Sequence, residues 1–130
     1  MASHNEYGAW GEAVAEDYLR HKGYSILDRN WRYGHKDIDI VAYEDDTDTL
    51  VIVEVKARHK EEVTTALQSV SIQKEKNLIA AGYAFARTTG HFFTNVRFDV
   101  ITIVGSKDNF TLEHYPNLFK PGNRNGRRLR

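Results

Sequence analysis

Apolar residues recur at helical spacing in the first part of the chain. Tyr7, Trp10, Val14 and Tyr18 fall on one helix face, and the alanines between them favour the same conformation. Gly23 stands where a helix often ends in a left-handed residue. The pattern therefore predicts a helix over residues 6–21.

Runs rich in β-branched residues then alternate with polar turns. The expected strands are 24–31, 37–43, 50–56, 96–104 and 109–115. The run at 50–56 is apolar at nearly every position up to Val53, which is typical of a strand covered on both faces in the middle of a sheet. The run at 109–115 is expected at an edge.

A second helix is expected over residues 69–87, after a polar loop at 57–68. Its candidate core positions are Ile72, Leu78, Ile79, Tyr83 and Phe85. The resulting order, α-β-β-β-α-β-β, predicts an α/β fold in which a central mixed sheet of about five strands is flanked by two main helices. The length of 130 residues suits a single domain, placed at residues 5–116, with a basic, flexible tail at 117–130.

The charges balance overall but not locally. Eighteen basic residues match eighteen acidic ones, which argues against a strongly basic coat protein for nucleic acid. Residues 120–130 hold five bases and no acid, so residues 1–119 carry a net charge of −5. The tail either adds salt-sensitive affinity for DNA or serves only solubility.

The sequence contains no cysteine, which excludes disulfides, cysteine-ligated metals and a thiol nucleophile within it. No apolar run approaches the roughly 20 residues that span a bilayer, and the first residues lack the basic and apolar regions of a secretion signal. We therefore expect a cytoplasmic protein with no membrane partner.

Ionisable residues interrupt two otherwise apolar strands. Asp37 and Asp39 share one strand face, and Glu54 and Lys56 share a face of the next strand. One interpretation is a hairpin with one solvated face, where acids and bases pair across strands. The acidic turn between them, residues 44–49, is expected to be a solvated tip and not a calcium loop, because the glycine and terminal glutamate of an EF-hand are missing.

The other interpretation of the charged strand residues is a metal site. Asp39 and Glu54 supply the oxygen ligands that Mg²⁺ prefers, and the carbonyl of Val55 is a third candidate. Lys56 would then lie near a bound phosphate or the attacking water, where a cation stabilises developing negative charge. This combination suits metal-dependent hydrolysis of phosphodiesters.

Several motifs, in order along residues 5–104, are similar to those of the YraN-like family. The matching segments are 11–15, 23–27, 29–32, 53–58 and 97–100. Asp39, followed by Glu54-Val55-Lys56, resembles the Asp…Glu-x-Lys signature of the PD-(D/E)xK nucleases. The resemblance implies a restriction-endonuclease-like fold and a predicted endonuclease distantly related to archaeal Holliday-junction resolvases.

Carried over by position, the resemblance implies that Asp39, Glu54 and Lys56 are catalytic. It also implies that Glu12 approaches the metal, whereas the helical pattern alone favours a solvated glutamate there. The family's Gly-Glu-Ile-Asp appears as Gly34-His-Lys-Asp37-Ile-Asp39, so Asp37 either assists the metal or, as we favour, balances Lys36.

Two basic residues are candidates for substrate binding. Arg58 shares strand parity with Lys56 and either contacts the substrate backbone or is an ordinary surface arginine. Lys74 matches a basic position of the family and either contacts phosphate or is a solvated helix lysine. Arg97 and Asp99 are expected to pair with each other, with Asp99 structural.

The expected function is therefore a Mg²⁺- or Mn²⁺-dependent endonuclease acting on DNA, with branched or Holliday-junction DNA implied by the resemblance. Symmetric cutting of two strands implies a homodimer. The alternative is a non-catalytic module on a nuclease scaffold that binds nucleic acid or docks a partner. RNA as the substrate stays open on sequence alone.

Overall fold

A computed structural model describes residues 4–60 and 65–119 of the chain. Part of the polar loop expected at 57–68 and most of the basic tail expected at 117–130 lie outside these residues. The described part begins with helix α1 (His4–His21), strand β1 (Ser25–Tyr33) and strand β2 (Lys36–Glu44). A short 3₁₀ turn, Asp45–Thr47, leads to β3 (Thr49–Arg58), and a second one, Leu67–Ser69, precedes α2 (Ile72–Thr89). The last two strands are β4 (Asn95–Ser106) and β5 (Asn109–Tyr115).

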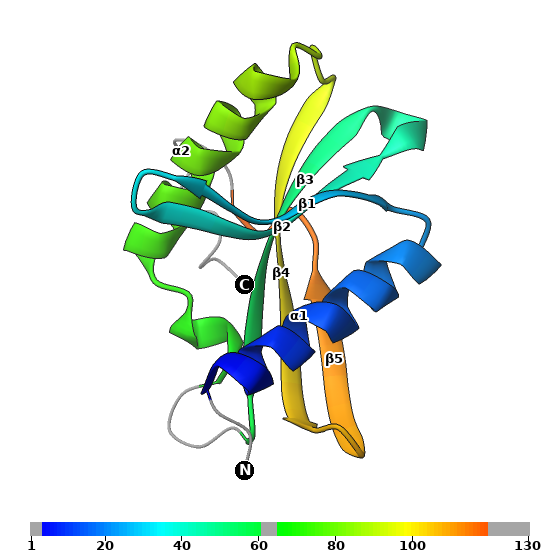
Figure 1. The fold of residues 1–130 in the computed structure, drawn as a ribbon, viewed down its shortest axis with the longest axis vertical. Coiled ribbons are helices and arrows are strands. Elements are labelled where there is room, and N and C mark those ends of the chain that lie inside the picture. The colour runs from blue at the N-terminus through cyan, green and yellow to red at the C-terminus, as the bar shows by residue number, and fades with distance from the viewer. Residues whose placement is uncertain (1–3, 61–64, 120–130) are drawn as a thin grey trace.

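The strands form one mixed sheet in the order β1-β2-β3-β4-β5. The β3–β4 pair is parallel and the other pairs are antiparallel, so α2 is the crossover connection between the two parallel strands. Helix α1 covers one face of the sheet and α2 the other (Figure 1). The predicted α/β fold, its element order and the central place of β3 are all confirmed.

Helix α1 packs with small residues against the sheet. Gly11 is so close to β3 that a Cβ there would lie 2.8 Å from the Cβ of Ala57. Ala15 and Leu19 continue this buried line.

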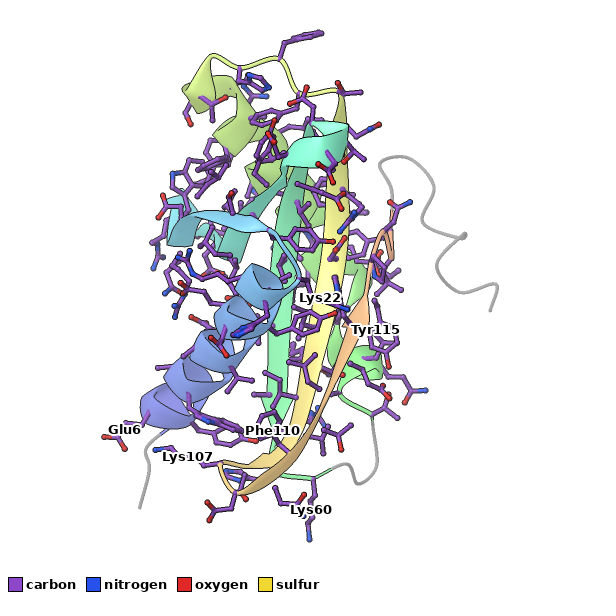
Figure 2. All side chains as sticks on the ribbon, turned by 90° about the vertical axis from the view of Figure 1, so that its right-hand side faces the viewer. Glu6, Lys22, Lys60, Lys107, Phe110 and Tyr115 are labelled. Carbon is purple, nitrogen blue, oxygen red and sulfur yellow. The ribbon has the colours of Figure 1, made fainter. Side chains whose placement is uncertain are left out.

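The large apolar residues of α1 lie beside the buried line. Trp10, Val14 and Tyr18 are only partly buried. Trp10 meets Phe110 of β5 edge to face, near the N-terminal end of the helix (Figure 2). The buried face of α1 therefore lies one residue along from the predicted positions at Trp10, Val14 and Tyr18.

Helix α2 repeats this arrangement on the opposite face. Its buried positions include Leu78, Ala81, Gly82 and Phe85, which pack on β3 and β4. Tyr83, expected in the core, is 38 % exposed, so that expectation is wrong. Ser71 caps the helix by accepting a hydrogen bond from the amide of Lys74, as a helix start requires.

Strand β2 separates from β3 halfway along its length. Its last paired residue on that side is Ile40, opposite Val53, whereas pairing with β1 continues to Tyr33 opposite Lys36. The free part is a two-stranded hairpin, here called the hairpin arm (residues 31–38), which leaves the sheet and crosses α2 (Figure 1). Within the described ranges, no helix is both long and apolar enough to cross a bilayer.

Candidate functional site

Asp39 lies at the point where β2 separates from β3. Its Oδ2 accepts a hydrogen bond of 2.8 Å from the backbone amide of Val55, so a side chain takes the place of a missing strand partner. The N–H and C=O of a strand residue point to the same side. The carbonyl of Val55 is therefore directed toward the same gap between the strands.

Glu54, on the neighbouring strand β3, is more deeply buried than Asp39, with only 3 % of the residue exposed. Burial and the neighbouring Asp39 carboxylate raise the pKa of Glu54 to about 8. Burial also raises the pKa of Asp39, although hydrogen bonds from Val55 and Glu54 act in the opposite direction. Both carboxyls are therefore harder to ionise than exposed ones, and the hydrogen bond between them favours the protonated form of Glu54 and the charged form of Asp39.

Two lysines flank the buried pair. Lys56 Nζ lies 4.0 Å from Oε2 of Glu54, and Lys74 Nζ lies 3.8 Å from Oε1. Burial lowers the pKa of Lys74, but the charges of Glu54 and Asp37 raise it overall. We call Asp39, Glu54, Lys56 and Lys74 the carboxylate site.

Lys74 is thus part of the site and not a solvated helix lysine. It also pairs with Asp37 at 3.4 Å, so the expectation that Asp37 balances Lys36 is wrong. Lys36 instead places its Nζ 6.0 Å from the ring of Tyr33. The reason is the geometry of the hairpin arm, which turns the Asp37 face of β2 toward the first turn of α2.

Glu12 lies at the side of α1 that faces the site. Burial raises the pKa of Glu12 and the Asp39 charge raises it further, despite hydrogen bonds from Arg29 and Asn30. Its side chain is 20 % exposed and lies 3.4 Å from Arg29. The interpretation of Glu12 as a solvated glutamate is therefore wrong, because the buried face of α1 runs through Gly11.

Arg58 lies two residues beyond Lys56 on β3 and is half-buried. It therefore extends the strand face that carries Glu54 and Lys56 toward the end of the strand. The geometry brings Asp39, Val55, Glu54 and Lys56 together, with Lys74 and Glu12 on either side.

The donor set fits a hard divalent cation. Oε1 of Glu54 is buried and has no hydrogen-bond partner among the residues that the structure describes, and a buried carboxyl in that state is costly unless a charge compensates it. Carboxylate and carbonyl oxygens suit Mg²⁺ or Mn²⁺. Over residues 4–60 and 65–119, no group of three or more acidic and histidine side chains is gathered into a ready metal cage. A cation here would therefore depend on the two carboxyls, the Val55 carbonyl, water and substrate.

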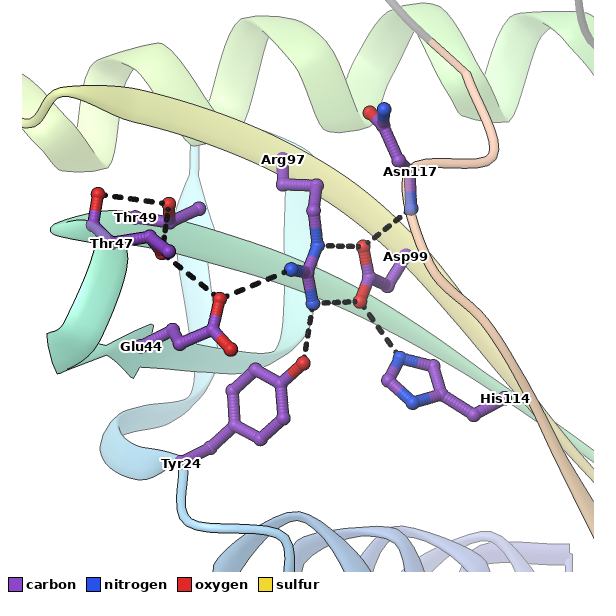
Figure 3. Close-up of polar contacts among 8 residues, drawn as sticks. All are labelled: Tyr24, Glu44, Thr47, Thr49, Arg97, Asp99, His114 and Asn117. Atoms are coloured by element: carbon purple, nitrogen blue, oxygen red, sulfur yellow. Dashed lines mark hydrogen bonds and ion pairs between the residues drawn. The ribbon is translucent and has the colours of Figure 1, made fainter.

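A second polar cluster lies on the α1 side of the sheet (Figure 3). Arg97 holds the fully buried Asp99 through two hydrogen bonds of 2.9 and 2.8 Å, and His114 contacts the same carboxylate at 2.7 Å. Burial would raise the pKa of Asp99, but the bonds from His114, Arg97 and the amide of Asn117 lower it overall. Arg97 also donates to Tyr24. Every bond of Asp99 is thus made to the protein itself, as expected for a structural pair.

The acidic turn between β2 and β3 is also bound by the protein. The carboxylate of Asp48 accepts hydrogen bonds from Tyr43 and Thr94 and contacts His91 at 2.7 Å. These contacts hold the pKa of Asp48 well below its usual range. Asp48 therefore serves to join the turn to the segment before β4, a role that the sequence pattern did not predict.

Comparison with known proteins gives a consistent family result. The model of a family described as "Uncharacterised protein family UPF0102" matches residues 11–103. A UPF0102 protein of Phocaeicola vulgatus is 43 % identical over 122 residues, covering 93 % of this chain and 98 % of that protein. One from Bacteroides thetaiotaomicron is 40 % identical over 121 residues with the same coverage. A UPF0102 protein of Lawsonia intracellularis is 39 % identical over 115 residues, covering 88 % of this chain and 86 % of that protein.

Proposed function

The chain belongs to the UPF0102 family, the YraN-like family that its motifs resemble, and we propose that it is a metal-dependent endonuclease that hydrolyses DNA. The observation that carries the proposal is the buried pair of Asp39 and Glu54, with Lys56 alongside, in the gap between β2 and β3. Branched or four-way junction DNA is the proposed substrate, because the resemblance of the motifs implies a distant relation to junction resolvases.

The free-energy cost of burying Asp39 and Glu54 side by side supports a functional role for the pair. Two carboxyls that face each other in a buried place disfavour the charged state, as the raised pKa values of both groups indicate. Hydrophobic residues at these positions would pack without that penalty. Perturbed acids beside a cation are typical of catalytic sites.

In this proposal the acids bind the metal ion and Lys56 acts on the substrate. Asp39, Glu54 and the Val55 carbonyl would hold Mg²⁺ or Mn²⁺, and Glu12 would approach from α1. When bound, the cation would polarise the scissile phosphate and make water more acidic. Lys56 reaches the Glu54 carboxylate from the open side of β3, where its charge stabilises a developing phosphate oxyanion or orients the attacking water.

Lys74 keeps the site from carrying an uncompensated negative charge. It contacts Glu54 and Asp37 at once and so joins β3, the hairpin arm and α2 through one cation. Phosphate binding would draw on the same charge. A homodimer, in which two such sites cut two strands, is part of the proposal by analogy with resolvases.

Cleavage assays test the proposal directly. Linear, flapped and four-way junction DNA are incubated with the protein in Mg²⁺, Mn²⁺ or EDTA, and the products are resolved on gels. We expect metal-dependent cutting that is lost in Glu54→Gln and reduced at least about a hundredfold in Lys56→Met.

Lys107→Met is the matched control for the lysine variant, because Lys107 is exposed in the turn between β4 and β5 (Figure 2). This variant should cut like the wild type. Binding of DNA without cutting under every metal condition, unchanged in Glu54→Gln and Lys56→Met, would instead support the non-catalytic binding module.

A further inference from the structure

The hairpin arm carries positive charge that the protein itself does not neutralise. Within the described residues, Arg32 and Lys36 form no ion pair with an acid, and Arg32 is exposed. The arm is nevertheless fixed, because Trp31 packs edge to face on Phe85 of α2. A fixed, uncompensated cationic tip beside an acidic site is suited to a polyanion.

The two faces of the arm differ in chemistry. Arg32 is the cross-strand partner of Asp37, which lies two residues from Asp39, so Arg32 shares the face that looks toward the carboxylate site. Tyr33 lies on the opposite face. Its ring is stacked parallel to Trp31, with centroids 6.3 Å apart, and the residue is 45 % exposed.

The length of the arm places its tip beyond the site. Tyr33 and Lys36 form the last strand pair, three residues along β2 from Asp39, and the turn of Gly34 and His35 follows. At about 3.3 Å per residue, the last pair lies roughly 10 Å from Asp39. A strand whose phosphate occupied the carboxylate site would therefore meet the arm within a few nucleotides.

We propose that the hairpin arm is a DNA-binding wedge that enters the branch point of the substrate. Arg32 binds the backbone of the strand that continues into the carboxylate site, and Tyr33 stacks on an unpaired base on the other side. Lys36 supports the Tyr33 ring and adds charge to the tip. The inference rests on the proposed function for its substrate and assigns to the arm the preference for branched over fully paired DNA.

Binding measured in EDTA tests the wedge separately from cleavage. The probes are a fluorescein-labelled duplex and the same duplex with a single-stranded DNA flap, and the readout is fluorescence anisotropy over a range of salt. Tyr33→Leu should weaken binding to the flapped DNA about tenfold and leave duplex binding within about twofold, because base stacking is lost. Tyr33→Phe keeps the ring and should bind like the wild type.

Arg32→Gln should weaken binding to both probes and reduce the slope of log affinity against log salt by about 0.9, as loss of one phosphate contact predicts. Lys22→Gln is the matched control, because Lys22 is an exposed base near the end of α1 (Figure 2). Its Nζ lies 6.0 Å from the centre of the Tyr18 ring, the same distance that separates Lys36 Nζ from the Tyr33 ring. This control variant should change neither affinity nor slope.

Three results would overturn the wedge: an equal loss on both probes in Tyr33→Leu, equal effects of Arg32→Gln and Lys22→Gln, or tighter binding of a flap made of RNA. The expected binding pattern in a protein that cuts no DNA in Mg²⁺ would support the wedge and contradict the endonuclease proposal.

Discussion

The amide of Val55 donates its hydrogen bond to the carboxylate of Asp39 at 2.8 Å, at the point where β2 stops pairing with β3. The same carboxyl that we assign to metal binding therefore also completes the backbone hydrogen bonding of the central strand. Asp39 thus has a structural role and a proposed chemical role, and suitable substitutions distinguish the two.

Asp39→Asn and Asp39→Ala should differ in stability, although we expect both to abolish the proposed cleavage. Asparagine keeps an oxygen that can accept the Val55 bond, whereas alanine leaves that amide without its partner. We expect the free energy of unfolding of Asp39→Asn to exceed that of Asp39→Ala by about 1–2 kcal/mol, measured by urea denaturation. Equal stabilities would show that water or a backbone shift replaces the bond.

Without metal, Glu54 should make the protein less stable as pH rises. Its folded pKa, about 8, lies above the ordinary value of 4.5, so between these values the folded state keeps a proton that the unfolded state has lost. The free energy of unfolding should therefore fall from about pH 5 to 8 relative to that of Glu54→Gln, by on the order of 3 kcal/mol.

Thermal melts of wild type and Glu54→Gln in EDTA across this pH range measure the difference. Mg²⁺ should restore stability at pH 8 in the wild type more than in the variant, because a ligand that binds only the folded state stabilises it. A difference between the two proteins that does not change from pH 5 to 8 would contradict the raised pKa of Glu54.

Two glycines of α1 should respond oppositely to alanine. No atom of the described part of the chain lies within 4 Å of a Cβ placed at Gly8, so Gly8→Ala should stabilise the protein by about 0.5–1 kcal/mol through helix propensity. Gly11→Ala should destabilise it despite the same gain, because its Cβ would lie 2.8 Å from that of Ala57. Chemical denaturation of both variants checks this, and a stabilised Gly11→Ala would mean that the helix can move outward freely.

Arg97→Met should destabilise the fold strongly without a specific effect on cleavage. It removes the bidentate partner of Asp99, whose side chain is fully buried, and we expect a loss of about 3 kcal/mol. Arg20→Met, at an exposed helix pair with Glu16, should cost less than about 0.5 kcal/mol. If the folded Arg97→Met protein binds DNA normally yet no longer cuts it, the structural assignment of this pair is wrong.

The sequence was a good guide to the elements because turns and glycines separate runs of clear periodicity. It was less accurate on the buried faces of the helices: Leu78 and Phe85 of α2 are buried as predicted, but Tyr83 is not, and the buried line of α1 lies beside the predicted positions, for one physical reason. The helices lie so close to the sheet that Gly11, Ala15, Ala81 and Gly82 form the contact lines, whereas a pattern of large apolar residues gives most weight to side chains beside those lines. Tyr83 was therefore expected in the core.

The carboxylate site was predictable in part. Strand alternation places Glu54 and Lys56 on one face, but the contact of Asp39 with Val55 depends on where β2 leaves β3, which no local pattern encodes. The place of Lys74 in the site could have been inferred from the sequence. A lysine in the first turn of a helix opposes the helix dipole, so its position points to a nearby acid, here Glu54 and Asp37.

The β2–β3 hairpin carries both acids of the site within a short stretch of chain, whereas β3 and β4 meet only after the α2 crossover. Because closing a short loop costs less entropy than closing a long one, we expect the two acids to meet early in folding, while water still surrounds them. Substitutions in the β2–β3 turn should then slow folding, and those in β4 should mainly speed unfolding, as stopped-flow kinetics would show. The free-energy cost of burying Asp39 and Glu54 together would thus reach its full size only in the last step, when the rest of the chain closes over them.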